Sequence, residues 1–214
     1  MGIRGIIFDM DGLMIDTEKW LNKYWCEAAK SYGFAMTEEH ALQIRSLSAP
    51  LASEKLKFLL GEDFPYEKVR DKRRFLMAEH VKQFGVEKKQ GLDAILTYAK
   101  EKKYRLAVAT ATDFARTEQY LRSIQVYDYF DAFVCGSMVK HGKPAPDIYI
   151  EAAKQLQLSP SECIALEDSP NGVLSAYRAG CKPIMVPDLD VPTEETKAML
   201  YGLANTLDAV VTML

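Results

Sequence analysis

Two aspartates two residues apart follow an apolar run near the beginning of the sequence. The run Ile6–Phe8 is β-rich, and Asp9 and Asp11 come directly after it, with Gly12 behind them. Such a run is typical of a buried strand in a parallel sheet, which would place Asp9 at the carboxyl end where open α/β sheets bind ligands. Two carboxylates there repel each other unless a cation is bound, so a metal ion is the simplest explanation. A turn of acidic residues that only closes the strand is the alternative.

A second acidic pair follows another apolar run later in the chain. Ile164–Leu166 ends in Glu167 and Asp168. The same argument predicts a strand end that faces a metal ion. The alternative is that these acids cap the helix that follows, as acidic residues often do.

Two further strand ends offer groups that bind anions. Thr110 ends a β-rich run, and a hydroxyl beside the amides of a helix start suits an anion. Lys143 lies between Gly142 and Pro144, and the prolines hold this loop so that the lysine is presented just before a helix. The alternatives are a threonine that only packs in its strand and a lysine that is only solvated.

Strand and helix patterns alternate along the part of the chain that contains these groups. Alternating strands and helices imply βαβ units, so we expect an α/β fold with a Rossmann-like parallel sheet core and helices on both faces. Asp113 is expected to cap one of the helices, and Gly180 to end another. After the first strand, the strand-like runs are Tyr104–Thr110, Ala132–Cys135, Glu162–Glu167 and Lys182–Val186, and the helical runs are Leu92–Lys102, Phe114–Ile124, Pro146–Leu156 and Asn171–Ala179.

The pattern changes between the first strand and Leu92. This stretch contains no convincing strand and consists instead of amphipathic helical segments separated by glycine and proline. It predicts an inserted α-helical cap domain of residues 16–88 above a catalytic core of residues 1–15 and 89–214. The predicted cap helices are Thr17–Tyr32, Glu38–Ile44, Leu51–Leu60 and Glu67–Phe84.

The composition is that of an ordinary globular chain. Of 214 residues, 48% are hydrophobic and 27% are charged, and the net charge of −3 gives no indication of nucleic acid or an anionic membrane as a partner. No apolar run approaches the ~20 residues of a membrane span, and the early first strand leaves no room for a signal peptide. The four cysteines are far apart, which favours reduced buried thiols over a metal set. A cytoplasmic protein is expected, and a monomer, because no long apolar repeat suggests an interface.

Together these residues resemble a known set of motifs. Asp9-x-Asp11-Gly12, Thr110, Lys143-Pro144 and Glu167-Asp168 are similar, in order, to the four motifs of the haloacid dehalogenase (HAD) superfamily of phosphotransferases. The position of the helical insert, directly after the first motif, also resembles that superfamily. The strings DMDGLMIDTE, GKPAPD and LEDSPNG resemble the β-phosphoglucomutase-like subgroup and its phosphatase relatives.

The resemblance implies a reaction that begins at Asp9. This residue would attack a phosphate ester in line and form an aspartyl-phosphate. Asp11 would protonate the leaving alcohol and would then activate water. The metal ligands that the resemblance implies for Mg²⁺ are Asp9, the backbone carbonyl of Asp11 and Asp168, with Glu167 as a water-mediated or more distant partner.

The resemblance also implies how the phosphoryl group is held. Thr110 and Lys143 would bind its oxygens and offset the charge that builds in the transition state. Backbone amides near Gly12 and Ala111 would also donate hydrogen bonds to the phosphoryl oxygens. Thr112 and the cap residue Arg45 complete the candidate substrate-binding set.

The choice among relatives depends on Asp11 and on the cap. Dehalogenases and phosphonate-cleaving relatives lack an acid at the position of Asp11. The mutase has a cap arginine where this chain has Ala49, and a histidine where it has Leu21, so the second cationic group that a bisphosphate needs is not evident. Arg70, Arg73 and Arg74 are interpreted as a solvated helix face.

We therefore predict a Mg²⁺-dependent phosphatase of a small phosphorylated metabolite, such as a sugar phosphate. A sugar phosphomutase of the β-phosphoglucomutase type is the alternative. A non-catalytic phosphate-binding or regulatory protein is a more remote one, because the nucleophile, the acid, the lysine and the metal aspartate are all present.

Overall fold

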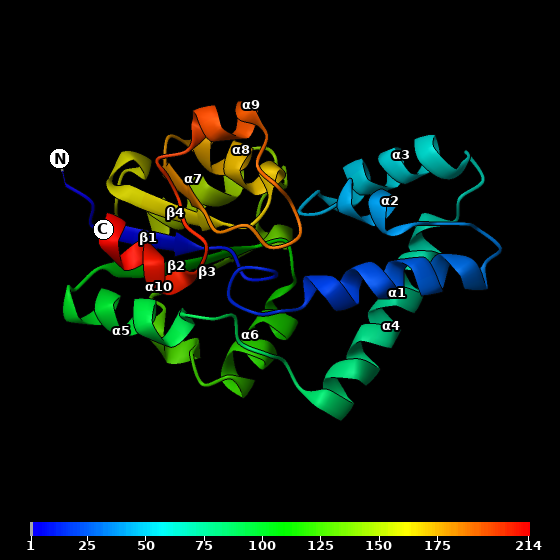
Figure 1. Cartoon of the computed structure of the whole chain (residues 1–214), viewed down its shortest axis with the longest axis horizontal. Coiled ribbons are helices and arrows are strands. Elements are labelled where there is room, and N and C mark those ends of the chain that lie inside the picture. Colours follow the sequence, from blue (N-terminus) through cyan, green and yellow to red (C-terminus); the bar gives the residue numbers. More distant parts are fainter. Residues whose placement is uncertain (1) are drawn as a thin grey trace.

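A parallel sheet of strands in the order β3-β2-β1-β4-β5-β6 forms the centre of the larger part of the molecule. The computed structural model describes residues 2–214, and Figure 1 shows this sheet beside a separate group of helices. All the strand pairs are parallel. The strands are β1 (Gly5–Phe8), β2 (Arg105–Thr110), β3 (Ala132–Cys135), β4 (Cys163–Glu167), β5 (Lys182–Met185) and β6 (Gly202–Leu203).

Helices cover both faces of the sheet because its strands are apolar on both sides. Side chains alternate between faces along a strand, so Ile6 and Phe8 enter one hydrophobic cluster and Ile7 enters the other. The first cluster packs against α5 (Leu92–Glu101), α6 (Phe114–Ser123) and α10 (Leu207–Val210), and the second packs against α7 (Asp147–Gln155) and α8 (Pro170–Ala179). The predicted α/β fold is confirmed. The remaining core helix is α9 (Glu194–Met199), and short 3-10 turns lie at Tyr127–Tyr129, Gly136–Met138, Pro160–Glu162 and Val211–Met213.

Local signals set several of the helix ends. The Asp113 carboxylate accepts a hydrogen bond from the Arg116 amide at 3.1 Å and caps α6. Gly180 ends α8 with φ of 84°, a left-handed conformation that glycine adopts without a Cβ clash. Ser169, rather than Glu167 or Asp168, caps the start of α8. Glu167 and Asp168 therefore do not cap this helix, which was the alternative interpretation of the acidic pair.

The segment after β1 forms four helices in the described chain: α1 (Glu18–Ser31), α2 (Glu38–Leu42), α3 (Ala49–Leu60) and α4 (Tyr66–Phe84). They lie to one side of the sheet in Figure 1 and have a hydrophobic cluster of their own, which includes Trp25, Leu56 and Val69. The two connections to the core run side by side, because the Asp16 amide donates to the Glu87 carbonyl at 2.9 Å. None of the helices in residues 2–214 combines the length and the apolar character that crossing a membrane requires.

Candidate active site

Register places the predicted site residues at one edge of the sheet. Phe8 of β1 is aligned with Val108 of β2 and with Leu166 of β4. The residues that follow these positions therefore emerge together at the carboxyl edge. Carboxylate oxygens of Asp9, Glu167 and Asp168 lie within 4.8 Å of one another.

Lys143 is buried at the centre of this edge and not solvated. Its Nζ lies 2.5 Å from Asp9 Oδ1 and 2.6 Å from Glu167 Oε1, and it donates to the Ala109 carbonyl at 3.1 Å. Burial alone would lower the pKa of Lys143, but the carboxylates of Asp9 and Glu167 raise it above its ordinary value. The ammonium therefore stays charged and offsets part of the negative charge. The Tyr149 hydroxyl, which sequence reasoning missed, donates to the same oxygen of Glu167 from the buried face of α7.

The lysine does not fully offset the cost of burying these acidic groups together. Burial raises the pKa of Asp9 well above its usual range, and the opposing effect of Lys143 does not cancel it. Burial likewise raises the pKa of Asp168, against the opposing effect of Arg45. Glu167 Oε2 and Asp168 Oδ1 are buried without a hydrogen-bond partner among residues 2–214. Unpaired buried carboxylate oxygens are suited to a divalent cation that prefers oxygen ligands, so the residues fit a divalent metal ion.

Gly12 brings the loop after the first strand close to the carboxylate of Asp168. Its φ is +84°, and a Cβ at this position would overlap the carboxylate of Asp168. Its amide donates to the Ile15 carbonyl at 2.9 Å and so closes the turn. The glycine therefore permits both the turn and the contact with Asp168.

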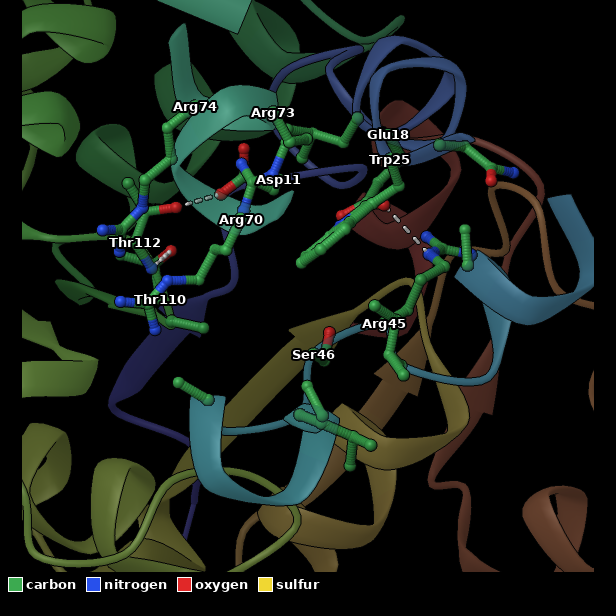
Figure 2. Close-up of a pocket in the computed structure, with 18 of the residues that line it drawn as sticks. Asp11, Glu18, Trp25, Arg45, Ser46, Arg70, Arg73, Arg74, Thr110 and Thr112 are labelled. Atoms are coloured by element: carbon green, nitrogen blue, oxygen red, sulfur yellow. Dashed lines mark hydrogen bonds and ion pairs between the residues drawn. The ribbon is translucent and has the colours of Figure 1, made fainter. Parts of the chain in front are cut away.

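Asp11 does not belong to the acidic cluster of Asp9, Glu167 and Asp168. Its Oδ1 accepts a hydrogen bond from the Thr17 hydroxyl, and its Oδ2 accepts one from the Thr112 hydroxyl, both at 2.7 Å. Figure 2 shows Asp11 beside Thr112 at the cavity. The Thr112 amide donates to Thr110 Oγ1 at 3.1 Å, which fixes the turn through Ala111. Two hydroxyls thus hold the Asp11 carboxylate in position beside the nucleophile candidate.

A cavity of about 160 Å³ separates the strand ends from the inserted helices. Core residues Asp11 and Thr110 form one part of its wall, and residues of α1–α4 such as Trp25 and Arg70 form another (Figure 2). Asp9 belongs to the core part of the wall. The cavity is small, so it suits a small molecule. Among the candidate residues, Asp9, Asp11, Arg45, Thr110, Ala111 and Thr112 line it.

Arg45 faces a group of carboxylates that sequence reasoning did not connect with it. Its guanidinium pairs with Asp168, lies 2.5 Å from Asp190 Oδ2 and lies 3.3 Å from Glu18 Oε2. Figure 2 shows the pairing with Glu18. Glu18 follows the first motif within the string DMDGLMIDTE, so its position in the sequence could have indicated it. Asp190 lies in a loop after β5, and no pattern marks it.

The prediction that Arg70, Arg73 and Arg74 form a solvated helix face is wrong for Arg70 and Arg73, which are half-buried, whereas Arg74 is exposed at the rim of the cavity. All three line the cavity (Figure 2). Arg116 of α6 lines it as well. Positions three and four apart lie on one face of a helix, and this face of α4 turns toward the strand ends. An arginine-rich face that covers a cavity and one that faces solvent have the same pattern in sequence, so only the structure distinguishes them.

Comparison with known proteins identifies the family. Residues 6–186 match the family model described as haloacid dehalogenase-like hydrolase. The chain belongs to this family. The phosphorylated carbohydrates phosphatase of Thermotoga maritima is 31% identical over 186 residues, which are 85% of this chain and 84% of that protein. Hexitol phosphatase A of Escherichia coli is 28% identical over 207 residues, with 95% and 93% coverage.

A solved structure agrees with this assignment over nearly the whole chain. The crystal structure of CbbY from Rhodobacter sphaeroides in complex with phosphate has a TM-score of 0.79 at 26% identity, and the match covers 97% of this chain and 96% of that one. The haloacid dehalogenase-like fold is therefore confirmed. Membership, together with the phosphatase relatives, confirms the prediction of a phosphoric monoester hydrolase.

Proposed function

We propose that this haloacid dehalogenase-like hydrolase is a Mg²⁺-dependent phosphatase of a small phosphorylated carbohydrate, with Asp9 as its nucleophile. The observation that best supports this is the position of Asp9: its carboxylate lies at the cavity, 2.5 Å from the Lys143 ammonium and beside Asp11. A carboxylate in this setting can attack phosphorus while the lysine offsets the charge of the phosphoryl oxygens.

The reaction has two steps in this site. Asp9 forms a bond to phosphorus as the ester P–O bond breaks, and Asp11 donates a proton to the leaving oxygen. Asp11 then takes a proton from water as that water attacks the aspartyl-phosphate, which releases phosphate and restores Asp9. The hydroxyls of Thr17 and Thr112 keep the Asp11 carboxylate oriented in both steps.

Phosphoryl oxygens need positive and donor groups on their other sides. We assign this role to Lys143 and to Thr110, with backbone amides of the loops at Gly12 and Ala111. Mg²⁺ would be held by Asp9, the Asp11 carbonyl and Asp168, with Glu167 behind them. When bound, the ion neutralises charge on the phosphoryl oxygens.

We also propose that residues 16–88 act as a cap domain over the core of residues 1–15 and 89–214. The side-by-side connections near Asp16 and Glu87 would serve as its hinges, and the leaving group would be selected between α4 and the strand ends. A cytoplasmic location and a monomeric state stay predictions from the sequence.

A sugar phosphomutase is a second candidate, and the α4 arginines favour it. A mutase needs a cationic group in the cap, and Arg70 and Arg73 supply one although position 49 is alanine. Phosphate release distinguishes the two activities.

The proposed function is tested by incubating a panel of phosphorylated sugars, polyols and acids with the wild type and with Asp9→Asn, with Mg²⁺ or with EDTA. We expect phosphate release that requires Mg²⁺ and falls by at least about 10³-fold in Asp9→Asn, as for loss of a nucleophile. Isomerised sugar phosphate with little free phosphate would favour the mutase. Activity retained by Asp9→Asn would contradict the proposal.

A further inference from the structure

Four arginines line the wall of the cavity formed by α4 and α6. They are Arg70, Arg73 and Arg74 of α4 and Arg116 of α6. Figure 2 shows the three α4 side chains beside Asp11 and the two threonines of the second strand end. The reaction proposed above uses none of them, because it assigns the transferred phosphoryl group to Lys143 and Thr110.

Arg73 differs from the other three in its partners. Arg70 pairs with Glu67 at 2.8 Å, Arg74 with Asp71 at 3.7 Å, and Arg116 with Asp113 at 2.5 Å, each within its own helix or at its cap. In the described chain, Nε of Arg73 and Nε of Arg70 are both buried without a hydrogen-bond partner, but of the four arginines only Arg73 pairs with no acidic side chain. Its guanidinium lies over the Trp25 ring, 5.1 Å from the ring centroid.

The surroundings of Arg73 are electropositive. Burial, together with the guanidiniums of Arg116 and Arg74, lowers the pKa of Arg73 to about 10, against an opposing effect of Asp11. Asp11 is the acid at this wall, but both of its carboxylate oxygens already accept hydrogen bonds from threonine hydroxyls. A guanidinium with a buried Nε and no ion-pair partner is costly unless a ligand supplies the anion.

We propose that Arg73, together with Arg70 and Arg116, forms a second anion subsite that binds the leaving group of the substrate. The substrate class is then a small phosphate ester with a second anionic group, a phosphate or a carboxylate. Arg guanidinium groups bind both kinds of anion through paired donors. This inference rests on the proposed function, because it takes the ester phosphate to lie at Asp9.

The subsite is tested by calorimetric measurement of phosphate-ester binding to Asp9→Asn with Mg²⁺ present. This variant lacks the proposed nucleophile, so we expect it to bind an ester without hydrolysing it. Two matched pairs differ only in the second anion: fructose 1,6-bisphosphate against fructose 1-phosphate, and 3-phosphoglycerate against glycerol 1-phosphate. We expect the member with a second anionic group to bind at least about tenfold more tightly in at least one pair, as charged hydrogen bonds allow. The pair that shows the preference identifies the second anion as phosphate or carboxylate.

Variants of α4 then assign the preference to Arg73. Adding Arg73→Gln to Asp9→Asn should reduce it at least about tenfold, and Arg73→Lys should restore part of it. Lys72→Gln is the matched control, because it removes one positive charge from the neighbouring position, which does not line the cavity. Thermal unfolding of each variant checks that it is folded.

Three outcomes would overturn the subsite. They are equal affinities within both pairs, no measurable binding of either member, and a preference that survives Arg73→Gln in a folded protein. The outcome is separate from that of the phosphatase assay. A preference without hydrolysis in the wild type would contradict the proposed function and leave only anion binding at Arg73, without a leaving-group role. Hydrolysis without preference would overturn the subsite alone.

Discussion

At the scale of single residues, Lys143 connects the charges of the site. Asp9, Glu167 and Asp168 are all buried, and their carboxylates can be close together because an ammonium lies between two of them. The positions of these acids and of Thr110 were predictable, because each follows an apolar run and parallel strands end at one edge. Arg73 was not predictable in the same way, because its role depends on how α4 is oriented toward the core.

Lys143→Met should destabilise the protein strongly in EDTA. The change leaves Asp9 and Glu167 buried without their cation, and breaking a buried ion pair by removing one partner costs about 3–5 kcal/mol. Urea denaturation measures this difference. Adding Glu167→Gln should recover part of the lost stability. Lys140→Met is the control, because it is at an exposed position of the same loop, and it should change the free energy of unfolding by less than about 0.5 kcal/mol. A loss below about 1 kcal/mol for Lys143→Met would contradict this account.

At the scale of elements, periodicity predicted most of the fold to within one or two residues. The strand predicted at Glu162–Glu167 is observed at Cys163–Glu167. Helix α3 begins at Ala49 and not at Leu51, because Pro50 occupies the first turn of the helix instead of preceding it. Strand β6 has only Gly202 and Leu203, too few residues for a pattern, and it was missed.

Helix α8 packs tightly against the Glu167 carboxylate at Gly172. The substitution Gly172→Ala tests how tight this contact is. A Cβ at Gly172 would overlap the Glu167 carboxylate, which Lys143 and Tyr149 hold in place. Alanine normally stabilises a helix relative to glycine, but here we expect destabilisation by about 1–3 kcal/mol from overpacking. Chemical denaturation gives the sign directly. A variant as stable as the wild type or more stable would show that the contact is not tight.

At the scale of the whole molecule, the inserted helices and the core meet through ion pairs as well as through the cavity. Arg45 of the insert pairs with Asp168 and Asp190 of the core, and the Asn171 side chain donates to the Arg45 carbonyl at 3.0 Å. Glu18 lies at the same junction, where burial raises its pKa from about 4.5 to about 7, against the opposing effect of Arg45.

This raised pKa predicts how stability depends on pH. The folded state binds the Glu18 proton more tightly than the unfolded state, so stability is greatest below pH 4.5 for this group and falls as the pH rises through 7. In EDTA, Glu18→Gln should therefore gain roughly 2–3 kcal/mol relative to the wild type between about pH 5 and 8. Urea denaturation across this range tests it, with the exposed Glu27→Gln on the same helix as control. Parallel curves for the wild type and Glu18→Gln would contradict the shift.

The most direct test of the central claim is to detect the covalent intermediate. The enzyme with Mg²⁺ and its best substrate from the panel is quenched in acid during turnover, and the peptide that contains Asp9 and Asp11 is fragmented in a mass spectrometer. We predict a phosphoryl group on Asp9 that hydroxylamine removes and that is absent in Asp9→Asn. A phosphoryl group on another residue, or rapid turnover with no modified peptide at any quench time, would contradict Asp9 as the nucleophile.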